Sequence, residues 1–191
     1  LTVHFTGDTS LRSRPMARIT DPMQEMGAQV IARDRGRMPL VIIGANLPIP
    51  IEYRLPVPSA QIKSAVLFAG LNTPGITRVI ETRPSRNHTE LMLQYFGADI
   101  DISDTMNGER VIKLRGQPEL DARNLIVPGD TSSAAFAVVA ALITKGSEII
   151  VHNVGLNPLR AGIFKTLSEM GAEISFDNRR EQAGEPAADL T

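Results

Sequence analysis

The chain has 191 residues, of which 42% are hydrophobic and 21% charged, a composition typical of a folded globular protein. Lys and Arg number 20 against 21 Asp and Glu, so a net charge of -1 provides no overall field that would attract nucleic acid or an anionic membrane. The absence of cysteine excludes disulfides, thiolate metal sites and cysteine nucleophiles, and it suits a reducing cytosol. No apolar run reaches the roughly 20 residues of a membrane-spanning helix, so we expect a soluble protein.

The first residues predict a strand followed by a helix. Leu1–Thr6 has the pattern of a strand interior and lacks an initiator Met or a cleavage site, so we expect the chain to begin inside a larger protein. Pro15 suits the first turn of a helix that runs towards Gly27, which places Arg14 at the helix entrance. The planar fork of an arginine there matches a carboxylate or a phosphate, whereas a solvated pair with Arg18 is the alternative.

The segment Ser59-Ala60-Gln61 begins the next predicted helix, and Ser59 can cap its N-terminus. The buried face of that helix would hold four apolar residues, Ile62, Ala65, Val66 and Ala69. A helix N-terminus attracts phosphate or carboxylate through its free amides and its dipole. The alternative interpretation is a well-capped helix with no ligand.

The middle of the chain predicts a strand, a helix and a hairpin. Gly75–Ile80 has a β-rich composition, Asn87–Phe96 has helical spacing, and Gly97 stands where a helix C-cap favours positive φ. Two strands, at 98–102 and 110–114, are joined across an Asn-Gly pair, which is a standard hairpin turn signal.

The turn from Thr82 to Glu90 carries Arg83 and Arg86 beside candidate helix caps. This signal is weak by itself, because many helix starts have such a composition. Corresponding strand-to-helix turns in layered α/β units emerge at the same end, where crevices collect ligands. We therefore expect the turns that carry Arg14, Ser59 and Arg86 to lie at one common ligand-binding crevice.

The last third predicts a strand at Asn124–Val127, a helix, and a new strand that opens at Glu148–Val151. Gly129–Ser133 resembles a phosphate-binding nest but lacks the lysine of a P-loop, so we interpret it as a helix cap formed by Asp130 or one of the two residues after it. Asn178–Ala188 is polar and aperiodic, and we interpret it as a loop or a frayed end.

An internal repeat underlies these elements. A Gly-Ala pair after a helical segment recurs at Gly27, Gly97 and Gly171, which lie 70 and 74 residues apart. A Val-Pro marker at positions 57 and 127 has the same 70-residue period. Two markers with one period indicate duplicated α/β units, each a small layer with one helix-rich face.

Five motifs stand in order between Thr6 and about Ile174. They are Gly7-Asp-x-Ser10-Leu-x-x-Arg14-Pro-Met16, Ser59-Ala-Gln-x-Lys-Ser64 with Leu71-Asn-Thr-Pro-Gly75, Arg86-Asn-His-Thr-Glu90, Pro128-Gly-Asp-x-Ser-Ser133 and Asn157-Pro158. Together they strongly resemble the bacterial 5-enolpyruvylshikimate-3-phosphate (EPSP) synthase family. The resemblance implies an inside-out α/β barrel of the enolpyruvyl transferase type, built of βαβαββ repeats of about 70 residues. It also implies that residues 1–126 form most of the substrate-binding domain and residues 127–191 part of a second domain.

The resemblance further implies transfer of the enolpyruvyl group of phosphoenolpyruvate to the 5-hydroxyl of shikimate 3-phosphate, with release of phosphate. By motif, Arg14 and Gln61 would contact phosphoenolpyruvate, and Ser59, Ala60, Gln61 and Arg86 would contact shikimate 3-phosphate, with Lys63 and Ser64 in supporting roles. The general base is expected beyond Thr191, so the 191 residues alone are expected to be inactive. No metal or organic cofactor is implied, and His4, His88 and His152 lack metal-ligand spacing. The parent enzyme is expected to be a cytoplasmic monomer that binds neither nucleic acid nor membrane.

Three alternatives stay open. UDP-N-acetylglucosamine enolpyruvyl transferases share the fold but usually carry a cysteine where this chain has Thr9. RNA 3'-terminal phosphate cyclases have a related architecture, and the neutral charge balance and the lack of a nucleotide loop count against them. The third alternative is a non-catalytic binding fragment. The sequence resembles the subclass associated with glyphosate tolerance, but the position that discriminates the inhibitor lies outside it.

Overall fold

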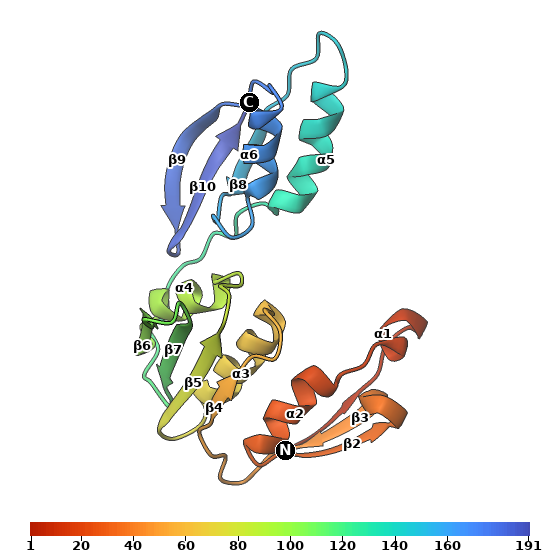
Figure 1. The fold of residues 1–191 in the computed structure, drawn as a ribbon, viewed down its shortest axis with the longest axis vertical. Helices are drawn as coiled ribbons and strands as arrows, with labels where there is room; N and C mark the ends of the chain where they lie inside the picture. Colours follow the sequence, from red (N-terminus) through yellow and green to blue (C-terminus); the bar gives the residue numbers. More distant parts are fainter. The chain divides into compact units, whose positions relative to one another are not determined.

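Three times along the chain, a strand is followed by a helix and then by two antiparallel strands, and this order confirms the predicted repeat. The computed structural model describes residues 1–191 (Figure 1). The three sets are β1 (Thr2–Phe5), α2 (Ala17–Glu25), β2 (Gln29–Arg33) and β3 (Arg37–Ile43); β5 (Ile76–Glu81), α4 (His88–Tyr95), β6 (Ile100–Asp104) and β7 (Arg110–Arg115); and β8 (Val151–Gly155), α6 (Gly162–Glu169), β9 (Phe176–Gln182) and β10 (Glu185–Leu190). The remaining elements are α1 (Thr9–Ser13), η1 (Asp34–Gly36), β4 (Glu52–Arg54), α3 (Ala60–Leu71) and α5 (Thr131–Leu142).

Each set forms a sheet with the same strand order. The last strand of each set lies in the centre, so that β3 separates β1 from β2, β7 separates β5 from β6, and β10 separates β8 from β9. All of these pairs are antiparallel. In the second sheet β4 adds a parallel edge strand, with Tyr53 opposite Val79. The identical order in three sheets is the structural counterpart of the sequence repeat.

The chain divides into two compact units. Unit 1 comprises Leu1–Ser85 and Gly97–Leu120, and unit 2 comprises Arg86–Phe96 and Asp121–Thr191. The predicted boundary after residue 126 concerns the domains of the whole family and stays a prediction.

The core of unit 1 forms where α3 packs on the second sheet. Ile62, Val66 and Leu67 on α3 are fully buried, and α3 contacts β5 and β7, whose residues Val79 and Ile112 are also fully buried. Burying such a side chain contributes about 1.5 to 3 kcal/mol to the stability of the fold. The helix that carries the candidate Ser59 turn is therefore firmly anchored.

The core of unit 2 lies between two helices and the third sheet. It consists of Ala134 and Val138 on α5, Val154 on β8, Phe164 on α6 and Leu190 on β10. The ring of Phe164 meets the ring of Phe176 edge to face, with the centroids 6.2 Å apart.

None of the helices combines the length and the apolar character that a membrane-spanning segment needs.

The predicted loop at Asn178–Ala188 is wrong, because this segment forms the hairpin of β9 and β10. Ala183 and Gly184 at its tip both have positive φ, 53° and 78°, as a two-residue hairpin turn requires. Ala187, Ala188 and Leu190 are buried in the centre of the sheet. Their cross-strand pairing supplies hydrogen bonds that a polar, aperiodic sequence does not reveal.

Two strand predictions also need correction. Asn124–Val127 is not a strand, because it pairs with no other strand and leaves Ile126 and Val127 exposed. The strand predicted to open at Glu148–Val151 starts only at Val151. The turn glycines, by contrast, are confirmed, since Gly97 has a φ of 87° after α4 and Gly108 a φ of 77° in the β6–β7 hairpin.

Candidate functional site

The N-terminus of α3 is the best formed of the candidate anion-binding turns. Ser59 is the N-cap in an extended conformation, and its Oγ accepts a hydrogen bond from the amide of Ile62 at 3.4 Å. The amide of Lys63 donates to the carbonyl of Ser59 at 3.1 Å, so the helical ladder starts there. The amides of Ala60 and Gln61 precede this ladder, and Gln61 is exposed. This geometry confirms the predicted cap and offers amide donors to an anion.

Arg14 lies at a different kind of position from the one predicted. It is the C-cap of the short helix α1, and its amide donates to the carbonyl of Leu11 at 3.2 Å. Pro15 forms a bridge with Arg37, and α2 begins only at Ala17. The prediction that Pro15 opens the helix is therefore wrong: Pro15 is held in extended pairing with Arg37, and Met16 is the N-cap of α2. Arg14 is also extended, with a ψ of 135°, as a residue before proline prefers. Its side chain is exposed.

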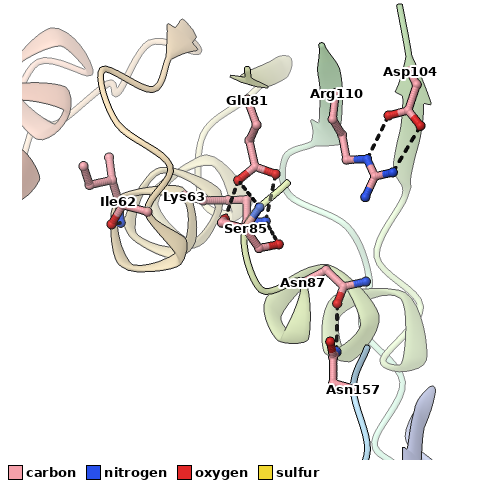
Figure 2. Close-up of polar contacts among 9 residues, drawn as sticks. Ile62, Lys63, Glu81, Ser85, Asn87, Asp104, Arg110 and Asn157 are labelled. Carbon is pink, nitrogen blue, oxygen red and sulfur yellow. Dashed lines mark hydrogen bonds and ion pairs between the residues drawn. The ribbon is translucent and has the colours of Figure 1, made fainter. Parts of the chain in front are cut away.

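A buried ion pair connects α3 to the end of β5. Lys63 and Glu81 both have fully buried side chains, and Lys63 Nζ lies 3.1 Å from Glu81 Oε2. The other carboxylate oxygen, Oε1, accepts hydrogen bonds from the amide of Ser85, at 3.3 Å, and from its hydroxyl. Lys63 Nζ also donates to the carbonyl oxygen of Ser85 at 3.4 Å (Figure 2). Lys63 is thus buried away from the surface, and its supporting role in the site stays a prediction.

Glu81 was not singled out from the sequence. It lies 18 residues from Lys63, at the end of a strand, and only the packing of α3 on β5 brings the two together. A signal was nevertheless present, because an acidic residue ends a run of buried strand residues and a lysine occupies the buried face of a helix. Such charges are rarely buried unless they are paired.

Arg86 follows Ser85 in the chain and opens the first segment of unit 2. Its side chain is exposed, whereas its neighbour Asn87 accepts a hydrogen bond from Asn157 Nδ2 at 2.8 Å (Figure 2). Asn157 Nδ2 also donates to Glu185 Oε2 at 2.9 Å, and Glu185 Oε1 pairs with His88 Nδ1. These contacts hold the entrance of α4 within unit 2.

The start of α5 is a capped helix, as the Gly129–Ser133 motif predicts. Asp130 is the N-cap, and its Oδ2 accepts a hydrogen bond from the amide of Ser133 at 2.9 Å. Its other oxygen, Oδ1, lies 3.0 Å from Nε of Arg160. The Arg160 guanidinium and then the Ser133 hydroxyl lower the pKa of the Asp130 carboxyl to about 2. Asp130 therefore stays ionised and is occupied by structural contacts.

Of the predicted site residues, Ser59, Ala60 and Gln61 share one helix turn. Arg14 belongs to another element of the same unit, and Arg86 to the second unit. None of them lines either of two cavities in unit 2. The smaller cavity has a volume of about 320 Å³ and is bordered by His88, Asp130 and Asn157. The larger, of about 740 Å³, lies beside the C-terminal end of α5.

Comparison with known proteins gives one consistent match. The family model of EPSP synthase (3-phosphoshikimate 1-carboxyvinyltransferase) matches residues 1–189. The chain is 58% identical over 189 residues to a 3-phosphoshikimate 1-carboxyvinyltransferase of Paramagnetospirillum magneticum and 57% identical over 190 residues to one of Ruegeria. These alignments cover 99% and 100% of this chain, which spans about 42% of the length of each relative.

Solved structures agree with these matches. EPSP synthase from Acinetobacter baumannii superimposes with a TM-score of 0.84 at 43% identity, covering 99% of this chain and 42% of that one. The enolpyruvyl transferase NikO of Streptomyces tendae gives a TM-score of 0.67 at 18% identity, covering 98% and 43%, a likeness of fold alone. The fold class predicted from the sequence is confirmed.

Proposed function

Because the chain belongs to the EPSP synthase family, we propose that it supplies part of the substrate site of a 3-phosphoshikimate 1-carboxyvinyltransferase. The proposed reaction transfers the enolpyruvyl group of phosphoenolpyruvate to the 5-hydroxyl of shikimate 3-phosphate and releases phosphate. Both substrates are anionic, so the site must offset their mutual repulsion with cationic and amide donors held in fixed positions. The observation that carries this proposal is the capped, solvent-facing N-terminus of α3.

In this proposal shikimate 3-phosphate is bound by the α3 turn and by an arginine. Hydrogen bonds come from the Ser59 hydroxyl, the amides of Ala60 and Gln61, and the Gln61 side chain. Arg86 contributes a guanidinium that forms two parallel hydrogen bonds. The exposure of Gln61 and Arg86 and the anchoring of α3 support this assignment.

Phosphoenolpyruvate is assigned to Arg14, with Gln61 as a second donor. Arg14 suits this role because its guanidinium is exposed and its backbone is fixed at the end of α1. A planar guanidinium forms two parallel hydrogen bonds to a carboxylate or a phosphate, which sets the orientation of the ligand as well as its affinity.

The proposal also assigns roles to the parts of a whole synthase. Residues 1–126 provide most of one substrate-binding domain and residues 127–191 part of a second domain. The general base belongs to another part of the enzyme, so the 191 residues alone are inactive. The whole enzyme is proposed to be a cytoplasmic monomer that needs no cofactor and binds neither nucleic acid nor membrane.

A chimeric synthase tests the proposed function directly. The 189 matching residues of the Paramagnetospirillum magneticum relative would be replaced by this chain. We expect phosphate release that depends on both substrates, and loss of that activity when Gln61 is replaced by Ala. A folded chimera that binds neither substrate would contradict the proposal.

The isolated chain provides a second test, by calorimetry with shikimate 3-phosphate. We expect weak or undetectable binding, because Ser59, Gln61 and Arg86 are only part of the proposed site. A submicromolar dissociation constant would show that these residues form a complete site by themselves.

A further inference from the structure

Ser85 contacts both members of the buried pair of Lys63 and Glu81. All three polar groups of Ser85 are bound to the pair, since its amide and hydroxyl donate to Glu81 Oε1 and its carbonyl oxygen accepts from Lys63 Nζ. Figure 2 shows these contacts converging between α3 and the end of β5. The network therefore holds the last residue before Arg86 against the helix that Ser59 caps.

Stability alone does not account for this arrangement. Removing two charges from water costs several kcal/mol per ion, and apolar residues of similar volume often stabilise a protein as well or better. Both side chains are fully buried, so neither can bind a substrate directly. What an apolar replacement could not provide is the set of donors and acceptors that fix the backbone and side chain of Ser85.

We propose that Glu81 and Lys63 are positioning residues. They hold Ser85 and thereby fix the backbone conformation of the residue that precedes Arg86. This inference rests on the proposed function, in which Arg86 contacts shikimate 3-phosphate. A displacement of about 1 Å at a substrate-binding group can lower a rate about a hundredfold. Contacts that fix the residue before an exposed, substrate-binding arginine therefore have consequences for catalysis. The pair that holds Ser85 is buried, whereas the Arg86 side chain, which would contact the ligand, is exposed.

The first experiment measures amide hydrogen exchange in the 191-residue chain. A paired replacement, Lys63→Met with Glu81→Leu, removes both charges together and avoids the unpaired buried charge that a single substitution would leave. We expect exchange at residues 82–87 to accelerate about tenfold or more, while exchange in the middle of α3 changes little. Unchanged exchange at 82–87 would overturn the inference whatever the function of the chain.

The second experiment measures steady-state kinetics in the chimeric synthase. Ser85→Ala and the paired replacement should lower kcat/KM for shikimate 3-phosphate about threefold and about tenfold, respectively, with little change in the KM for phosphoenolpyruvate. Ser85→Thr keeps the hydroxyl and should restore most of the loss. As a control, Lys113→Met with Asp101→Leu removes an exposed pair and should leave the kinetics unchanged.

A double-mutant cycle with Arg86→Ala separates positioning from general stability. In the Arg86→Ala background, the paired replacement should lower kcat/KM by less than about twofold, because the group that it positions is gone. An equal loss in both backgrounds, or no loss in either, would overturn the inference alone. If Arg86→Ala itself had no effect, the proposed role of Arg86 would fail, and the inference with it.

Discussion

Asn157 Nδ2 lies 2.8 Å from Asn87 Oδ1 and 2.9 Å from Glu185 Oε2, so one amide group joins the start of α4 and the start of β10 to the loop after β8. The Oδ1 atom of Asn157 accepts a further hydrogen bond from the amide of Leu159 at 2.9 Å. Asn157 is only 2% exposed, and its hydrogen-bonding capacity is used almost completely. The Asn-Pro motif that contributed to the family resemblance thus has a structural role.

Replacing Asn157 by Ala should therefore destabilise unit 2. The substitution leaves the Asn87 and Glu185 acceptors without this donor in a partly buried place, which costs about 1 to 3 kcal/mol. Urea denaturation followed by circular dichroism would measure the change. Asn124→Ala, at an exposed position, is the matched control and should change the free energy of unfolding by less than about 0.5 kcal/mol. Equal effects of the two substitutions would argue against a structural role for this amide.

Gly116 should tolerate no side chain. A Cβ atom there would overlap the carbonyl oxygens of Thr73 and Gly70, which are backbone atoms and cannot move aside. We expect Gly116→Ala to lower the free energy of unfolding by at least about 3 kcal/mol, as overpacking against rigid atoms does. Gly162 begins α6, and a Cβ atom added there would meet no other atom within 4 Å, so Gly162→Ala should be neutral or stabilising by up to about 1 kcal/mol. The urea midpoints of the two variants measure these changes, and a Gly116→Ala midpoint equal to that of Gly162→Ala would contradict the prediction.

Features with a local chemical cause were predictable from the sequence. Ser59 and Asp130 cap helices because a side-chain oxygen next to free amides satisfies them wherever the chain lies. Gly97 takes a positive φ because helix ends favour the left-handed conformation. The repeat was visible because duplicated units place the same residue types at the same turns.

Features that depend on distant partners were missed. Asp189 of the β9–β10 hairpin accepts hydrogen bonds from Asn153, Asn178 and Arg180, so polar residues there pair with one another instead of with water. A sequence pattern cannot distinguish such pairing from a solvated loop. The pairing of Glu81 with Lys63 was missed for the same reason, since the two residues lie on different elements.

The stability of the chain should depend on the ionisation of Asp130. Hydrogen bonds from Arg160, and then from Ser133, lower the pKa of this carboxyl from 3.8 to about 2 in the folded chain. The folded pKa is below the unfolded one, so the stabilisation is fully present above pH 3.8 and is lost as the pH falls towards 2. Urea midpoints at pH 5, 4, 3 and 2 should fall more steeply for the original chain than for Asp130→Asn, which still caps α5 but has no charge.

Arg160→Met provides the control for this pH dependence. It removes the largest cause of the lowered pKa but leaves the Ser133 hydrogen bonds, so its acid-induced loss of stability should be intermediate. If all three chains lost stability in parallel between pH 4 and 2, other carboxylates would be responsible for the acid sensitivity.

Arg14 is expected to be important for the turnover of phosphoenolpyruvate. In the chimeric synthase, Arg14→Ala should lower turnover of phosphoenolpyruvate by at least about two orders of magnitude, because one charge-assisted contact supplies roughly 2.7 kcal/mol or more in the transition state. Arg14→Lys should recover only part of the activity, since an ammonium keeps the charge but not the planar fork. Arg12→Ala is the matched control, because Arg12 is also exposed and lies on α1. Near-normal steady-state kinetics of Arg14→Ala would remove Arg14 from the site, whereas an equal loss in Arg12→Ala would indicate a general effect of positive charge.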